Sequence, residues 1–210
     1  MIDVHAHIGL DEYKTWKNKL PKGQPAEDLV KKMLESNIEK AVVFSFPFTS
    51  YFDLKTVYDL NMRPSGKMKF AYEQENKYVL ESAEKHACLI PFLSICLGEH
   101  SNYEWVEEIV KTNKKIRGFK LHSRSSRSAI KQLAGSKFMK LAQEYELSFM
   151  IHTDSENINL GHLNFNYMRF SDPMQLIELS DKHPDVKLAG AHLGWVSKRF
   201  LDEVKRRENV

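Results

Sequence analysis

The strongest constraint on the fold is a regular alternation of short apolar runs with amphipathic segments. The apolar runs are rich in β-branched and aromatic residues, which favour strands, and they span residues 2–8, 40–46, 88–95, 116–122, 147–152 and 186–192. Helical periodicity marks residues 26–37, 73–86, 103–113, 128–145, 173–183 and 197–208. Strands that alternate with helices, each strand being apolar almost throughout, are typical of an α/β protein with a parallel sheet covered by helices.

The composition is that of one soluble globular domain over residues 1–210. The 31 Lys and Arg residues against 28 Asp and Glu residues give a net charge of +3, which is too small to indicate a nucleic acid or membrane partner. No run approaches the roughly 20 apolar residues that cross a bilayer, and Met1 leads directly into a strand, so we expect a cytoplasmic protein. Cys88 and Cys96 lack the spacing of a metal or redox pair and are expected to be buried thiols.

Two histidines lie two residues apart on the first predicted strand. His5 and His7 would point to the same face, because side chains alternate along a strand. Two imidazoles placed in this way can both reach one ion at 2.0–2.1 Å, the usual Zn–N distance. The alternative is a strand with two ordinary polar residues near its end, since so short a motif often arises by chance.

Three later strands end on a histidine, namely His122, His152 and His192. The carboxyl ends of parallel strands meet at one edge of the sheet, so we expect these imidazoles to converge with the first-strand pair. A single strand histidine is more often a hydrogen-bonded core residue, but four strands with the same arrangement favour a metal site.

Side-chain alternation supports this assignment. In the fourth strand Lys120 shares the face of His122, whereas Phe119 and Leu121 point to the helices. In the fifth strand Phe149 also points to the helices. Polar groups are therefore predicted inside the rim and apolar groups outside it.

Four blocks of the sequence carry a resemblance: Val4-His5-Ala6-His7-Ile8-Gly9, Gly118-Phe119-Lys120-Leu121-His122, the strand ending at His152, and Ala191-His192-Leu193-Gly194-Trp195. They resemble the amidohydrolase-related group of metal-dependent hydrolases, which includes decarboxylases similar to aminocarboxymuconate semialdehyde decarboxylase. The resemblance implies a TIM-type (β/α)8 barrel with a divalent metal, most often zinc, with manganese as the alternative. It also implies that His5, His7 and His152 are metal ligands and that His192 is the catalytic residue acting on metal-bound water or substrate.

The sequence departs from this family at its end. Family members take a further aspartate from the eighth strand, whereas about six strand–helix units precede Val210, and a full barrel needs about 250 residues. We therefore expect a barrel without its last two units, whose open edges favour pairing with another copy of the chain. Asp3 and Asp154 face the right way but do not match the eighth-strand block.

The expected activity is hydrolysis of a C–N or C–O bond, or non-oxidative decarboxylation, of a small molecule. Lys120 and His122 would bind a carboxylate or carbonyl of the substrate, and a carboxylated Lys120 bridging two metals is less favoured. Residues 48–69 and 153–172 are long connections without a motif that indicates the substrate.

Two rival functions stay open from the sequence. A nuclease similar to the TatD type shares the His-x-His start, but it has a glutamate at the end of the fourth strand, where this chain has Lys120-Leu121-His122. A catalytically inactive scaffold would bind metal weakly or not at all and would act through its open edge.

Overall fold

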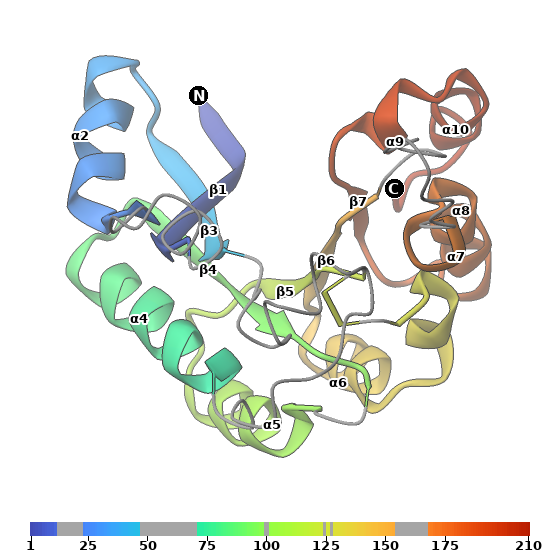
Figure 1. Cartoon of the computed structure of the whole chain (residues 1–210), viewed down its shortest axis with the longest axis horizontal. Helices are drawn as coiled ribbons and strands as arrows, with labels where there is room; N and C mark the ends of the chain where they lie inside the picture. The colour runs from blue at the N-terminus through green and yellow to red at the C-terminus, as the bar shows by residue number, and fades with distance from the viewer. Residues whose placement is uncertain (12–22, 47–70, 99–100, 124, 127, 154–167) are drawn as a thin grey trace, which may run out of the picture. The chain divides into compact units, whose positions relative to one another are not determined.

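The computed structural model describes residues 1–11, 23–46, 71–98, 101–123, 125–126, 128–153 and 168–210 (Figure 1). The chain divides into two compact units. The N-terminal unit comprises Met1–Ser94 and Glu104–Arg117, and the C-terminal unit comprises Ile95–Tyr103 and Gly118–Val210. The predicted connection 48–69 lies outside the described residues, as does most of 153–172. A single domain over the whole chain stays a prediction.

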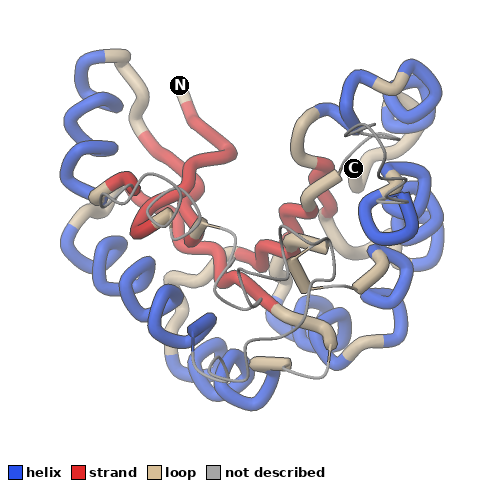
Figure 2. Tube along the Cα trace, in the orientation of Figure 1, coloured by secondary structure: helices blue, strands red, loops and turns tan. Residues whose placement is uncertain are grey.

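The N-terminal unit follows the predicted alternation. Its strands are β1 (Ile2–Leu10), β2 (Gly23–Gln24), β3 (Lys40–Ser45) and β4 (Leu89–Ile95), and its helices are α2 (Ala26–Glu35), α4 (Ala71–Lys85) and α5 (Tyr103–Thr112). The strand order is β2-β1-β3-β4, with β1, β3 and β4 parallel. The short β2 pairs antiparallel with the end of β1 and was not predicted. Figure 2 shows the strands in red and the helices in blue.

The core of this unit forms between β1, β3 and the helices α2 and α4. Ala6 and Ile8 of β1 are buried there, together with Met33 of α2 and Val79 of α4. Ile2 and Val4, earlier on β1, are 54% and 59% exposed. The pairing of β1 with β3 shifts register between Asp3 and Ala6, so Ile2, opposite Lys40, does not share the buried face of Ala6, which lies opposite Val43.

The C-terminal unit also alternates strands with helices. Its strands are β5 (Gly118–Leu121), β6 (Ser148–Ile151) and β7 (Leu188–Gly190), and its helices are η1 (Ile130–Gly135), α6 (Lys137–Tyr145), α7 (Met168–Ser171), α8 (Pro173–Lys182), α9 (Leu193–Val196) and α10 (Lys198–Val204). The three strands are parallel, in the order β5-β6-β7. The fold class is therefore α/β with a mostly parallel sheet, as predicted.

Packing in this unit confirms the predicted facing of the strands. The ring of Phe119 lies 5.9 Å from that of Phe138 on α6 and 5.4 Å from that of Phe149. All three rings are fully buried. Aromatic pairs at these distances add to the stability that burial of their area supplies.

Two predicted helices differ from the structure. The segment predicted as one helix over 128–145 is a 3₁₀ helix followed by α6, because Ser136 interrupts it and caps α6 by accepting a hydrogen bond from the Met139 N–H at 3.2 Å. The last helix ends at Val204 rather than at 208. The backbone carbonyl of Asn209 instead accepts a hydrogen bond from the Leu188 N–H at 2.7 Å, which fixes the end of the chain to β7.

In the part of the chain that the structure describes, no helix is both long and apolar enough to span a bilayer.

Gly194 offers a test of the packing beside β7. Its φ of +57° is in the left-handed region, and an added Cβ would collide with the ring of Phe200. Gly194→Ala should lower the free energy of unfolding by about 1–3 kcal/mol, measured by chemical denaturation. Gly135→Ala is the matched control, because a Cβ at Gly135 meets no atom within 4 Å. Equal free energies of unfolding for the two variants would contradict the close contact between Gly194 and the ring of Phe200.

Candidate metal centre

The side chains of His5 and His7 meet at the open face of β1. Their Nε2 atoms lie 3.3 Å apart, and both rings are half-buried. Two nitrogens that bind one ion tetrahedrally at 2.0–2.1 Å lie about 3.3 Å apart. The two side chains therefore point to the same side of β1, as the alternation predicted, and their spacing is compatible with two ligands of one tetrahedral ion.

An irregularity in β1 sets the direction of His5. The pairing of β1 with β3 shifts register between Asp3 and Ala6, and the backbone N–H of His5 donates to Oδ1 of Asp3 at 2.9 Å. A bulge in a strand redirects the side chain that follows it. Asp3, which the sequence placed on the ligand face, thus supports the strand that carries the histidines.

A hydrogen bond to β3 fixes the ring of His7. Its Nδ1 lies 2.8 Å from the carbonyl oxygen of Ser45, and a carbonyl can only accept, so Nδ1 carries the proton. The neutral ring then has its lone pair on Nε2, the atom that faces His5. The ring is also held at 4.7 Å from Phe44, edge to face, and stacked at 5.1 Å on Phe46. His7 is therefore in the tautomer that binds a metal through Nε2.

A buried polar chain supports Ser45 in turn. The hydroxyls of Ser45 and Ser94 lie 2.7 Å apart. The side chain of Asn76 accepts from the Ser94 N–H at 2.8 Å and donates to the Ser94 carbonyl at 2.9 Å. These three residues come from β3, β4 and α4 and are all buried. Buried polar groups that are fully bonded in this way define one arrangement of the elements that carry them.

A cavity of about 630 Å³ adjoins the histidine pair within the N-terminal unit. Its wall includes residues from both faces of β1, with Ala6 as well as His5 and His7, and residues of α2 such as Lys32 and Met33. Small-molecule sites commonly have volumes of about 300–1,000 Å³. The pair therefore lies beside a space large enough for a small substrate.

The C-terminal unit brings three predicted histidines together at the ends of its strands. The ring centroid of His152 lies 4.0 Å from that of His122 and 4.8 Å from that of His192. Nε2 of His192 lies 3.2 Å from Nδ1 of His152, so one of these nitrogens donates to the other. The prediction that strand-end histidines gather is confirmed for these three residues.

His192 occupies a strained turn directly after β7. His192, Leu193 and Gly194 are all in the left-handed region, with φ of 63°, 51° and 57°. This conformation costs roughly 1–2 kcal/mol for each residue that has a Cβ, and such strain collects at functional sites. Thr153 donates a hydrogen bond from its hydroxyl to the Ala191 carbonyl and thereby ties the end of β6 to this turn.

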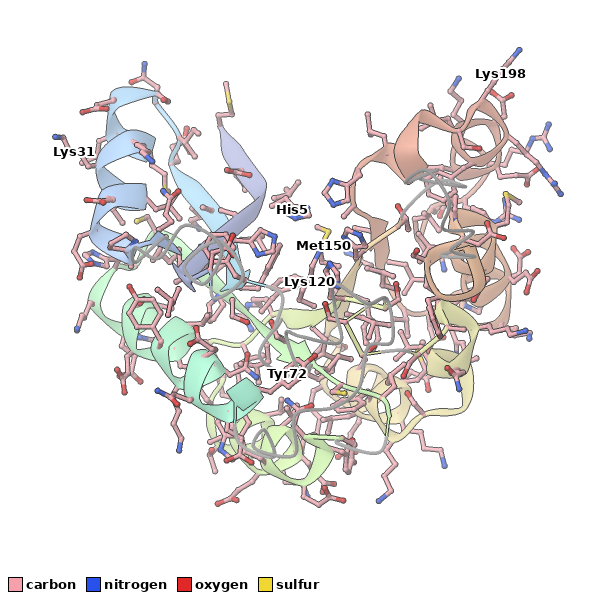
Figure 3. The ribbon with its side chains drawn as sticks, in the orientation of Figure 1. His5, Lys31, Tyr72, Lys120, Met150 and Lys198 are labelled. Atoms are coloured by element: carbon pink, nitrogen blue, oxygen red, sulfur yellow. The ribbon has the colours of Figure 1, made fainter. Side chains whose placement is uncertain are left out.

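Lys120 of β5 is buried, with 2% of its surface exposed. It pairs in register with Met150 of β6, and both residues are labelled in Figure 3. Burial disfavours the charged ammonium and lowers the pKa of Lys120 to about 7. A lysine in this state can be a neutral hydrogen-bonding amine near neutral pH.

Among the described residues, no group of three or more His, Cys, Asp or Glu side chains is arranged so that it could hold a metal ion. His5 and His7 form a pair in the N-terminal unit, and the rings of His122, His152 and His192 lie together in the C-terminal unit without forming such a group. Convergence of the two groups stays a prediction, and Asp154 lies outside the described residues.

Lys120→Met tests the burial of the amine. Between pH 7 and the pKa near 10.4 of the unfolded chain, only the unfolded state holds the proton, so wild-type stability falls by about 1.4 kcal/mol per unit as the pH drops. The variant should therefore gain more free energy of unfolding at about pH 7.5 than at about pH 9.5, by roughly 2–3 kcal/mol in denaturant titrations. Lys31→Met, on the exposed face of α2, should show no such difference. A gain that is the same at both pH values would contradict the shifted pKa.

Several solved structures have a fold similar to that of this chain. The structure is similar to 2,6-dihydroxybenzoate decarboxylase in complex with 2,6-dihydroxybenzoate, with a TM-score of 0.62 and 13% identity over 99% of this chain and 70% of that one. It is similar to a 5-carboxyvanillate decarboxylase from Novosphingobium aromaticivorans complexed with manganese and 4-hydroxy-3-methoxy-5-nitrobenzoic acid, with a TM-score of 0.62 and 13% identity over 98% of this chain and 68% of that one. It is also similar to IDCase from Metarhizium anisopliae in apo form, with a TM-score of 0.56 and 14% identity over 100% of this chain and 73% of that one.

Structural likeness at these identities shows the fold alone. In sequence, no curated protein matches the chain. The pattern that defines the amidohydrolase family, by contrast, matches residues 2–210, which is nearly the whole chain. The chain therefore belongs to the amidohydrolase family, as the histidine blocks of the sequence predicted.

Proposed function

We propose that this chain acts on a small molecule as a metal-dependent hydrolase of C–N or C–O bonds or as a non-oxidative decarboxylase. The observation that carries the proposal is the His5–His7 pair, whose Nε2 atoms lie 3.3 Å apart while Nδ1 of His7 donates to Ser45. Membership of the amidohydrolase family supports it. The decarboxylase names among similar structures make decarboxylation one of the two reactions to test.

The ligands in this proposal are His5, His7 and, from the sequence, His152. Imidazole suits several divalent ions, so zinc and manganese are both candidates, with zinc favoured. Manganese accompanies one of the similar structures. When bound, such an ion lowers the pKa of water from 15.7 to about 7 or polarises a carbonyl as a Lewis acid.

His192 is the proposed general acid or base. If His152 ligates through Nε2, its Nδ1–H donates to Nε2 of His192, because these nitrogens lie 3.2 Å apart. His192 then holds its own proton on Nδ1, the atom that would exchange it with the substrate or with water. The left-handed turn at residues 192–194 fixes the backbone that aims this ring.

Lys120 and His122 are the proposed substrate-binding residues. Both are on β5 or directly after it, and the ring of His122 lies against that of His152. A carboxylate or carbonyl of a small molecule is the group that an amine and an imidazole N–H would bind. The charge of +3 gives no reason to propose a nucleic acid or membrane partner, and a cytoplasmic location and self-association stay predictions.

Metal analysis of the purified 210-residue chain tests the proposal. We expect near-stoichiometric zinc or manganese, and we expect His5→Ala and His7→Ala to weaken metal affinity by at least about 100-fold, because outer-shell changes alone cost about 10- to 100-fold. His183→Ala is the matched control, because His183 ends α8 outside the candidate site. Loaded protein should then consume a hydroxybenzoate such as 2,6-dihydroxybenzoate, or hydrolyse an amide or ester from a substrate panel.

Two results of the metal analysis would contradict the proposal. Wild-type protein that takes up no zinc or manganese, or that retains it equally in the His5→Ala and His7→Ala variants, would reject the metal-dependent reaction. It would leave the scaffold as the better interpretation of the fold.

A further inference from the structure

One residue holds His122 by two hydrogen bonds to the same ring nitrogen. The backbone N–H of Ser125 donates to Nδ1 of His122 at 3.2 Å, and the Ser125 hydroxyl lies 2.7 Å from that nitrogen. A backbone amide can only donate, so Nδ1 carries the lone pair and the hydroxyl donates to it as well. A neutral imidazole has one N–H, which in His122 is therefore on Nε2.

Further hydrogen bonds in the turn after β5 hold Ser125 and His122 in this arrangement. The Ser126 N–H donates to the His122 carbonyl at 3.0 Å, and the Ser126 hydroxyl donates to the Ser123 carbonyl at 3.2 Å. The Ser123 hydroxyl donates to the carbonyl of His152 at 3.2 Å, which joins the turn to the end of β6. The side chains of Ser123, Ser125 and Ser126 are all buried. Water therefore does not compete for these bonds, and the turn has one favourable arrangement.

His122 and His7 are consequently held in opposite tautomers. His7 donates from Nδ1 to a carbonyl and keeps its lone pair on Nε2, whereas His122 accepts at Nδ1 and keeps its proton on Nε2. A nitrogen that bears a proton cannot ligate a metal. While Ser125 holds the ring, Nε2 of His122 is a donor and not a ligand, although the ring lies only 4.0 Å from that of His152.

We propose that Ser125 is a positioning residue that holds His122 as an Nε2–H donor, and that this donor binds a carboxylate or carbonyl oxygen of the substrate. The inference rests on the proposed function and deepens it, because it names the residue that orients His122 and the ring atom that donates to the substrate oxygen. An oxygen of a ligand can accept a hydrogen bond from this N–H, whereas an N–H of a ligand would meet the donor unfavourably. The buried amine of Lys120, two residues earlier on β5, lies on the same strand face.

The tautomer can be read directly in metal-free protein labelled with ¹⁵N-histidine. At about pH 8.5, some two units above the ordinary imidazole pKa of about 6.5, long-range ¹H–¹⁵N correlation spectra distinguish the two neutral forms. We expect His122 to show the Nε2–H pattern and His7 the Nδ1–H pattern. The Ser125→Ala variant should move part of His122 to the other tautomer, and Ser125→Thr should restore it. An Nδ1–H pattern for wild-type His122 would overturn the proposal.

Binding of benzoate, a simple carboxylate probe, tests the donor role. The amide of Gln places an N–H near the position of imidazole Nε2, whereas the amide of Asn reaches only the position of Nδ1. His122→Gln should therefore retain benzoate affinity within about threefold of wild type, and His122→Asn should lose about tenfold or more, as expected for one hydrogen bond to a charged group. Equal affinities for the two variants, or no benzoate binding by wild type, would overturn the oxygen-binding role.

These measurements separate the inference from the proposed function, because both are made without metal. A chain that shows the predicted tautomer and benzoate preference but takes up no zinc or manganese would contradict the metal-dependent reaction alone. A chain that binds metal through His5 and His7 but has His122 in the Nδ1–H form would contradict the inference alone.

Discussion

The candidate chemistry of the N-terminal unit depends on the parallel pairing of β1 with β3. That pairing sets His7 opposite Phe44 and Ile8 opposite Ser45, and it thereby brings the Ser45 carbonyl to Nδ1 of His7. The two-residue alternation of the strand then buries Ala6 and Ile8 on one face and leaves His5 and His7 half-buried on the other. One register therefore determines both the packing of β1 and the state of its histidines. A shift by one residue would exchange the two faces.

The sequence predicted much of this because the relevant signals are local. Apolar runs located the six longer strands, and the positions of Phe119, Phe149 and the strand-end histidines followed from alternation alone. The break at Ser136 was missed because the apolar pattern continues across it, although a serine before a helical run is a recognisable cap. The two-residue β2 has too short a sequence to give any pattern.

The tautomers could not be predicted, because each depends on a partner that local pattern does not reveal. Ser45 is 38 residues from His7 along the chain, and its contribution is a backbone carbonyl that any residue would supply. The role of Asn76 had a weak signal, since a polar amide lies within the apolar face of α4 that includes Tyr72 and Val79. The role of Ser125 had no signal in the sequence, because the serines that follow His122 resemble those of an ordinary polar loop.

The hydrogen bond between His7 and Ser45 has a consequence for how an ion would enter. Many small metal sites are assembled by the ion itself, so that the chain remains unfolded until the ligands are bound. Here the ring is preorganised by the sheet and by two neighbouring phenylalanines. Ion uptake would accordingly need little rearrangement of this strand, and the folding of the N-terminal unit would not have to wait for it. Maturation of such a protein can then be a late event that follows the supply of the ion.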